Sequence, residues 1–146
     1  MKPLKPQVRY YVAEGFTGVI NPRPGDAGYD LVSGEERVIM HDEQLSIKTG
    51  LHLGIPDEYF AMIRDRSSLA LKKVRVQAGI IDPSFRGEVE VILHNQGLRP
   101  YSIKPGDRIA QLVFLPLVTP VLKQVTDIKS LPFSLRGRGG FGSTGE

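Results

Sequence analysis

Residues 45–55 read LSIKTGLHLGI, a stretch in which every odd position carries an apolar or β-branched side chain and every even position is polar or small. Alternation with a period of two places one face of a β-strand inward and the other toward solvent. The same pattern returns at Val89, Val91 and Leu93. The two stretches therefore predict two half-buried strands.

Shorter runs rich in β-branched and aromatic residues predict further strands between clusters of turn-forming residues. These runs cover residues 8–12, 38–40, 59–63, 74–76 and 109–118. One or two helical turns are expected over residues 67–73, with Ser67 as the N-cap. Many short strands with almost no helix indicate an all-β domain, whether a sandwich, a barrel or a jelly roll.

The length and composition of the chain narrow its class. Its 146 residues suit a single domain. The 19 Lys and Arg give a net charge of +3 but are spread along the chain, which fits a compact anionic ligand better than direct nucleic-acid binding. The lack of cysteine excludes disulfides and thiolate metal sites. No stretch approaches the length of a membrane span, so we expect a soluble, cytoplasmic protein.

The end of the chain differs in composition from the rest. Residues 136–146 read RGRGGFGSTGE and offer one large apolar side chain, Phe141, so this segment cannot build a core of its own. Guanidinium groups, hydroxyls and unhindered amides suit phosphate oxygens, and a lone phenylalanine suits the face of a base. We expect residues 1–132 to form the β domain and residues 133–146 to form an arm that orders on something else.

The motif GIIDPSFRGEV contains the candidate catalytic residue. Two isoleucines lead Asp82 to the end of a strand, where Pro83 stops the pairing. A carboxylate that leaves an apolar strand is partly desolvated, and this makes it a better base toward water. The alternative for Asp82 is an Asx-turn residue that only shapes the loop, and the alternative for Phe85 is a core aromatic.

Three further motifs suit phosphate chemistry. RDRSSLA places Arg66 beside Ser67 and Ser68 at a strand exit, where they can bind phosphate oxygens; the alternative is a helix cap with a solvated arginine. Asp30, in DAGYDL, can orient a metal-bound water, hold an arginine in place, or simply occupy a turn. Gln111 lies in an apolar run and must find a partner, more often backbone than ligand.

Five segments occur in order between residues 26 and 145: AGYDL, RSSLA, GIIDPSFRG, GDRIAQLVF and RGRGGFGSTG. In order and spacing they resemble the five motifs of the trimeric dUTP pyrophosphatases (dUTPases). The resemblance implies a jelly-roll-like β-barrel in a homotrimer, with shared active sites that are each closed by the flexible C-terminal arm of another subunit. It also implies hydrolysis of dUTP to dUMP and pyrophosphate, which limits uracil incorporation into DNA and supplies dUMP for dTMP synthesis.

The resemblance implies a role for each matching residue. Asp82 corresponds to the catalytic aspartate that activates water, and Phe85 to the aromatic that packs under the deoxyribose. The hairpin around residues 76–81 would read uracil through backbone groups and leave no room for a thymine methyl. Asp30 resembles an aspartate that supports the metal and water arrangement from behind the direct ligands. The other implied substrate ligands are Gln77, Gly79 and Ile81 for the base; Arg66, Ser67, Ser68, Gln111, Arg136, Ser143 and Thr144 for the phosphates; and Phe141 with Gly142 over the base.

The implied reaction fits the chemistry of these residues. Water attack at the α-phosphorus needs a base and dispersed positive charge on the departing pyrophosphate. Mg²⁺ would arrive held mainly by the triphosphate and by waters, so no direct metal ligand is expected in the sequence.

Two other functions are considered. The IDP-aromatic-x-G pattern is also similar to that of dCTP deaminases and bifunctional deaminase-dUTPases, but those enzymes use a glutamate ten residues after the motif aspartate, where this chain has Ile92. A non-catalytic nucleotide-binding regulator on the same fold would not need the positioned base Asp82. The third motif departs from the commonest dUTPase pattern at Pro83, and at Ser84 and Phe85, where an acidic residue and a tyrosine are usual.

Overall fold

The structure is a computed structural model that describes residues 5–140, and within this range it contains eleven strands, one short α-helix and one 3-10 helix. In chain order these are β1 (Arg9–Val12), β2 (Val19–Ile20), β3 (Tyr29–Val32), β4 (Arg37–Ile39), β5 (Gln44–Gly54), β6 (Tyr59–Arg64), α1 (Ser67–Leu71), β7 (Val74–Val76), β8 (Ile80–Ile81), β9 (Val89–Asn95), β10 (Tyr101–Ile103), β11 (Arg108–Pro116) and η1 (Ile128–Ser130). None of the described helices is long and apolar enough to span a bilayer.

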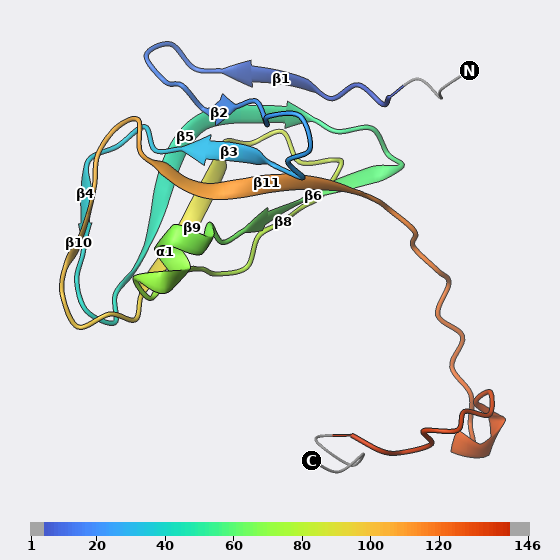
Figure 1. Cartoon of the computed structure of the whole chain (residues 1–146). Helices are drawn as coiled ribbons and strands as arrows, with labels where there is room; N and C mark the ends of the chain where they lie inside the picture. The colour runs from blue at the N-terminus through green and yellow to red at the C-terminus, as the bar shows by residue number, and fades with distance from the viewer. Residues whose placement is uncertain (1–4, 141–146) are drawn as a thin grey trace.

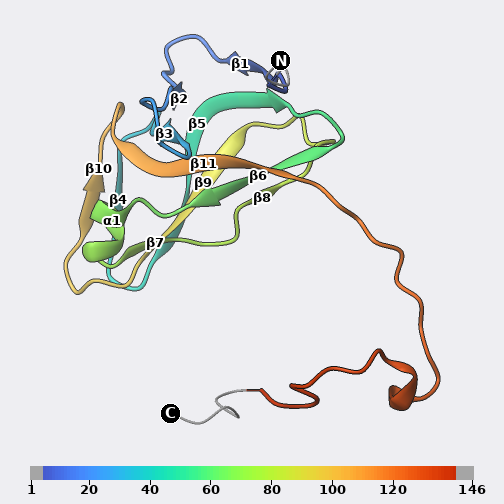
Figure 2. The same ribbon diagram turned by 45° about the vertical axis from the view of Figure 1, so that its right-hand side comes forward.

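The strands form three antiparallel sheets around one core (Figures 1 and 2). One sheet has four strands in the order β1-β5-β9-β7, and a second has five in the order β2-β3-β11-β6-β8. The pair β10-β4 lies at one end of the barrel. Because the chain passes repeatedly from one sheet to the other, the predicted all-β, jelly-roll-like barrel is confirmed.

The LSIKTGLHLGI stretch forms β5 and the residue after it, and its predicted inward face is buried. Ile47, Thr49 and Leu51 have no exposed surface. β9 pairs with β5 and buries the three residues that the same alternation predicts. Branched side chains from the other strands complete the core: Leu31, Ile39, Ile103, Ile109 and Leu112.

The remaining predicted strands are confirmed with ends that differ by two residues at most. The sequence does not predict β2, β3 or β10, because these strands have only two to four residues and lie among turn-forming residues. The predicted cap of α1 is wrong. Arg66 is the N-cap, with extended backbone at φ −85° and ψ 136°, no side chain caps the helix, and Ser67 is the first helical residue.

A bulge interrupts β5 at Thr49 and Gly50, where the pairing with β9 shifts register. The Thr49 hydroxyl donates to the Val89 carbonyl at 2.5 Å and accepts from the Leu51 amide at 3.2 Å. Gly50 has a φ of +70°, and a Cβ built on it would lie 2.4 Å from Cγ of Phe16. Only glycine therefore suits this position, which holds Phe16 against the barrel.

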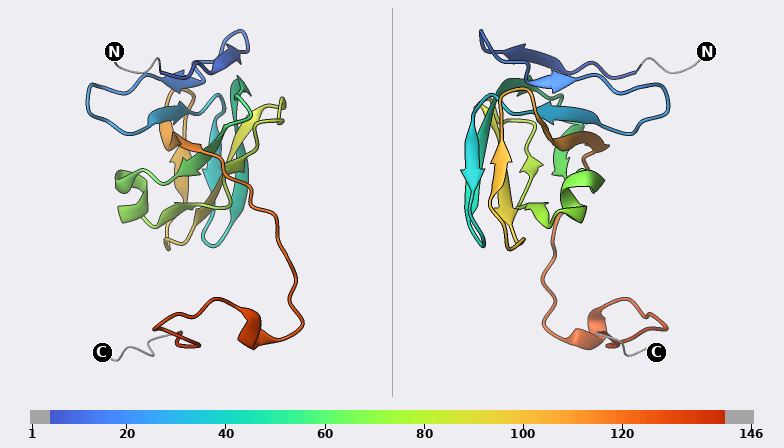
Figure 3. Two further views of the ribbon diagram at one scale, coloured as in Figure 1. Left: turned by 90° about the vertical axis from the view of Figure 1, so that its right-hand side faces the viewer. Right: turned by 60° about the vertical axis from the view of Figure 1, so that its left-hand side comes forward.

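The chain leaves the barrel after β11. The amide of Leu117 donates to the Glu58 carbonyl at 2.8 Å, and the chain then runs away from the barrel (Figures 1 and 3). Its apolar side chains stay in solvent: Leu122 is 94% exposed and Leu135 98%. These side chains therefore make no contribution to the core of the barrel.

Replacing Gly50 with alanine tests the bulge. The new methyl group would overlap Phe16, and the alanine would have to adopt a left-handed backbone conformation. The free energy of unfolding should therefore fall by about 2–4 kcal/mol. Gly15→Ala is the matched control, because Gly15 has a φ of +82° and open space around its Cβ position. Chemical denaturation should show a clearly smaller loss for Gly15→Ala, and equal losses would contradict the packing argument.

Candidate active site

A pocket of about 430 Å³ lies where the four-stranded and five-stranded sheets meet. Its walls come from the segment between β7 and β8, the turn after β8, and the outer face of β9. A volume of this size suits a small-molecule ligand. The pocket is lined by five of the predicted site residues: Gln77, Gly79, Ile81, Asp82 and Phe85.

The segment between β7 and β8 crosses from one sheet to the other. The Gln77 amide donates to the Ile92 carbonyl of β9 at 2.9 Å, and the Gly79 carbonyl accepts from the Ile63 amide of β6 at 2.7 Å. Gly79 has a φ of +117°, and a Cβ on it would lie 2.7 Å from the Ile63 carbonyl oxygen. The close backbone approach to β6 therefore requires glycine at this position of the pocket wall.

Asp82 follows β8 and is exposed, so the predicted partial burial is wrong for the single chain. The reason is that β8 ends at Ile81 and the next residues turn along the surface. Among the described residues, no group donates a hydrogen bond to the Asp82 carboxylate, so the Asx-turn alternative is not observed. The carboxylate is thus available to a ligand or to water.

Phe85 lies at the pocket and not in the core. It is 42% exposed, and its ring covers Gly87, where a Cβ would lie 2.6 Å from Cζ of Phe85. The Phe85 amide donates to the Asp82 carbonyl at 3.1 Å, which closes the turn between the two residues. The turn therefore presents a carboxylate and an aromatic ring at the same pocket.

A second group of predicted residues centres on Asp30 of β3. One oxygen of its carboxylate lies 3.2 Å from Nε of Arg66, and the other accepts from Nη1 of Arg108 at 3.0 Å. Nη1 of Arg66 also donates to the Arg108 carbonyl at 3.0 Å. Of the alternative roles for Asp30, the structure thus favours the one in which its carboxylate holds an arginine in place. The two residues that follow Arg66, Ser67 and Ser68, are exposed.

Gln111 belongs to the same group. It lies on β11, opposite Asp30 on one side and Arg64 on the other. Its side-chain amide donates to the Asp65 carbonyl at 2.8 Å, so the prediction of a backbone partner is confirmed. We call Asp30, Arg66, Ser67, Ser68 and Gln111, together with Arg108, the arginine cluster.

Asp82 and the arginine cluster lie toward opposite ends of β6. Ala61 pairs with Ile81, so Asp82 follows at the level of residue 60, whereas the cluster begins beyond Arg64. The four residue-to-residue steps from 60 to 64 span about 13 Å in an extended strand, with Arg66 farther on. Figures 1 and 2 show α1 at one end of β6 and the chain that leaves β8 at the other. One chain therefore does not bring all the predicted residues together.

Arg108 and Tyr101 are two members of this region that the sequence does not single out. Arg108 stands in the motif GDRIAQLVF, but nothing in the sequence links it to Asp30, which is distant along the chain. Burial raises the pKa of the Tyr101 phenol; Asp107 adds to the rise and Arg66 opposes it. Tyr101 therefore stays a neutral hydrogen-bonding group near the arginines.

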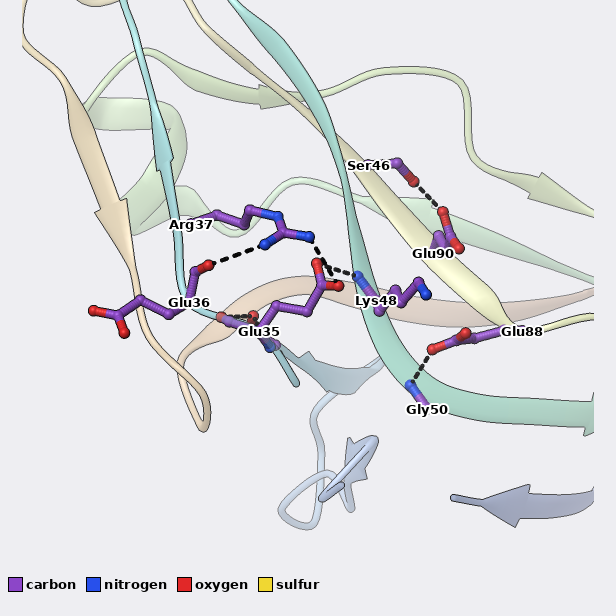
Figure 4. Close-up of polar contacts among 9 residues, drawn as sticks. Glu35, Glu36, Arg37, Ser46, Lys48, Gly50, Glu88 and Glu90 are labelled. Carbon is purple, nitrogen blue, oxygen red and sulfur yellow. Dashed lines mark hydrogen bonds and ion pairs between the residues drawn. The ribbon is translucent and has the colours of Figure 1, made fainter. Parts of the chain in front are cut away.

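Glu90 of β9 and Glu88, the residue just before β9, also line the pocket. A carboxylate oxygen of Glu88 accepts from the Gly50 amide at 2.8 Å, and Glu90 accepts from the Ser46 hydroxyl (Figure 4). They share a face of the strand with Ile92, as their even spacing predicts. Both carboxylates are thus held by β5.

The predicted arm residues fall partly outside the described range. Arg136 is exposed, and its Nε donates to the Gly139 carbonyl at 2.8 Å. Four predicted ligands lie outside the described residues: Phe141, Gly142, Ser143 and Thr144.

Comparison with known proteins identifies the family. A sequence model described as dUTPase matches residues 7–145. This chain belongs to the dUTPase family. A deoxyuridine 5'-triphosphate nucleotidohydrolase of Oryza sativa is 44% identical over 120 residues, which cover 82% of this chain and 68% of the relative. The enzyme of the same name from Clostridium acetobutylicum is 46% identical over 125 residues and 83% of each chain.

Solved structures agree with the sequence relatives. The Staphylococcus bacteriophage 80alpha dUTPase with dUPNHPP has a TM-score of 0.88 and 29% identity, covering 97% of this chain and all of the other. A mutant dUTPase from phage phi11 of S. aureus, described with a structural Mg(II) ion, has a TM-score of 0.78 and 26% identity over 86% of this chain and all of the other. These relatives favour the dUTPase prediction over the deaminase and the regulator.

Asp30→Asn tests the arginine cluster of this dUTPase. The asparagine side chain has one accepting oxygen, so it can bind one arginine only and turns its NH₂ group toward the other. The arginine that loses its partner is held less well for the phosphates, and the KM for dUTP should rise about 5–30-fold. Asp26→Asn is the matched control, because Asp26 pairs only with the exposed Arg23 at the surface. Steady-state kinetics in which both variants match the wild type would contradict the proposed role of Asp30.

Proposed function

We propose that this dUTPase hydrolyses dUTP to dUMP and pyrophosphate, with Asp82 activating the water that attacks the α-phosphate. The main support is the pocket, which is lined by residues 77–81, an aromatic ring and a carboxylate for which the described residues provide no donor. Backbone N–H and C=O groups suit the polar edge of a uracil, and the face of Phe85 suits the deoxyribose. Asp82 then lies at the sugar and α-phosphate end of the bound nucleotide.

The two groups of residues supply different parts of the chemistry. The Asp82 carboxylate takes a proton from the attacking water. Arg66 and Arg108, held by Asp30, bring positive charge to the phosphates and disperse the charge that develops on the departing pyrophosphate. The hydroxyls of Ser67 and Ser68 add neutral donors. Base activation and charge dispersal together define a nucleotide pyrophosphohydrolase.

Mg²⁺ is the expected cofactor. The donor set of this chain fits an ion held mainly by the triphosphate and by waters, because both carboxylate oxygens of Asp30 already face arginines. Once bound, the ion would neutralise negative charge on the phosphate tail. The chain's own contribution is to place the phosphates against the arginine cluster and the water against Asp82.

The active form is a homotrimer in which neighbouring chains complete each site. Within one chain, Asp82 and the arginine cluster lie too far apart to meet on one nucleotide at the α-phosphate. A head-to-tail ring brings the pocket of one chain to the cluster of the next. The exposed apolar residues after Pro116 provide surface for such contacts. In this arrangement the C-terminal arm, from residue 133 onward, closes over a neighbour's site.

Asp82→Asn tests the proposed reaction. The asparagine keeps the shape of the side chain but cannot accept the proton, so kcat should fall about 10²- to 10⁴-fold with little change in substrate binding. Turnover is measured by separating dUMP and pyrophosphate, and binding by calorimetry with a non-cleavable dUTP analogue. Asp57→Asn is the control, since Asp57 is exposed in the turn between β5 and β6 and does not line the pocket.

The same assay compares nucleotides. Wild-type protein given Mg²⁺ with dUTP, dCTP, dTTP or UTP should turn over dUTP by far the fastest. Full activity of Asp82→Asn on dUTP would show that Asp82 is only a loop residue. Release of ammonia from dCTP would instead point to a deaminase.

A further inference from the structure

Asp65 contacts the arginine cluster through Gln111 and also contacts β7, the strand that precedes the pocket wall. It follows β6 directly, and its side chain is only 18% exposed. Its carboxylate accepts from the Val76 amide at 2.5 Å and from Nε of Arg75 at 2.8 Å. Its main-chain carbonyl accepts from the side-chain amide of Gln111 at 2.8 Å. None of the roles assigned above falls to Asp65 itself.

The two side-chain contacts fall on β7, the strand that leads into the pocket wall. β7 is the edge strand of its sheet and pairs only with β9. The Gln77 amide points to β9, so the Val76 amide, one residue before it, points to the other side of the strand. There the carboxylate of Asp65 takes the place of a missing neighbouring strand. The first residue of the wall, Gln77, follows immediately.

We propose that Asp65 is a positioning residue that sets the base selectivity of the pocket, an inference that rests on the proposed function. The pocket wall between β7 and β8 has two anchors on the β6 side. One is the bond between Ile63 and Gly79 at its far end, and the other is the contact of Asp65 with Val76 at its near end. A wall made of backbone distinguishes bases by its position, so loosening the near anchor admits a base of the wrong shape.

The main-chain and side-chain contacts of Asp65 can be separated by mutation. A change of side chain leaves the carbonyl that binds Gln111 in place, so the arginine cluster keeps its geometry. Asparagine in place of Asp65 can still accept one hydrogen bond, but it loses the charge and turns its NH₂ group toward Val76 or Arg75. The base side of the site should therefore change while the phosphate side does not.

The test compares nucleotides in the Asp65→Asn variant of the full chain. The ratio of kcat/KM for dUTP to kcat/KM for dTTP should fall about tenfold, the effect of losing one charge-assisted hydrogen bond. The inhibition constant of inorganic pyrophosphate, which probes the phosphate side alone, should stay within about twofold of the wild type. Asp42→Asn is the matched control: Asp42 pairs with His94, the residue opposite Arg75 on β9, and does not line the pocket.

The outcomes separate this inference from the proposed function. A wild-type protein that does not turn over dUTP would overturn the proposed function. A wild type that is active, with an unchanged selectivity ratio in folded Asp65→Asn, would overturn the role of Asp65 alone. An equal loss on all nucleotides, accompanied by weaker inhibition by pyrophosphate, would mean that Asp65 is merely structural.

A second variant covers the case in which Asp65→Asn fails to fold. Asp65→Glu keeps the charge but moves the carboxylate by one methylene group, so its selectivity ratio should lie between those of the wild type and Asp65→Asn. If only Asp65→Glu folds, a fall of severalfold in the ratio supports the inference. A ratio equal to that of the wild type overturns it.

Discussion

The crossing of residues 77–79 between two sheets is the constraint on which the site depends. The Gln77 amide is bound to β9 in one sheet and the Gly79 carbonyl to β6 in the other, and the positive φ of Gly79 permits the close approach to β6. Because the two anchors belong to different sheets, the pocket exists only when the barrel is closed. The fold and the base-binding surface are therefore consequences of the same backbone contacts.

The antiparallel pairing of β6 with β8 divides the catalytic groups. It carries Asp82 to one end of β6, while the chain continues from the other end into Arg66 and α1. One chain thus keeps the Asp82 carboxylate apart from the arginine cluster, and under the proposed function each needs a complement from another chain. In the proposed homotrimer, a ring of identical chains would supply both complements at once, and a domain with a complete core could then have an incomplete site.

Much of the fold follows from the sequence. The alternation in residues 45–55 predicts β5 and its buried face, because every second side chain of a strand points to the same face. The order of the motifs predicts which residues line the pocket. β2, β3 and β10 are missed because they are short and lie among turn-forming residues, whereas equally short strands such as β7 are rich enough in β-branched residues to be predicted. Contacts between distant segments, including those of Asp30 with Arg108 and of Asp65 with Val76, depend on strand register and cannot be derived from local sequence.

In the proposed homotrimer, each active site combines Asp82 of one chain with Arg66 of another. Mixing Asp82→Asn with Arg66→Ala tests it, because each variant keeps the half-site that the other lacks. When the two variants are refolded together in equal amounts and assemble at random, about a quarter of the sites should contain both an intact Asp82 and an intact Arg66. The rate of dUTP hydrolysis should then recover to about a quarter of the wild-type rate. A co-assembled mixture that stays as inactive as its separate components would contradict the account.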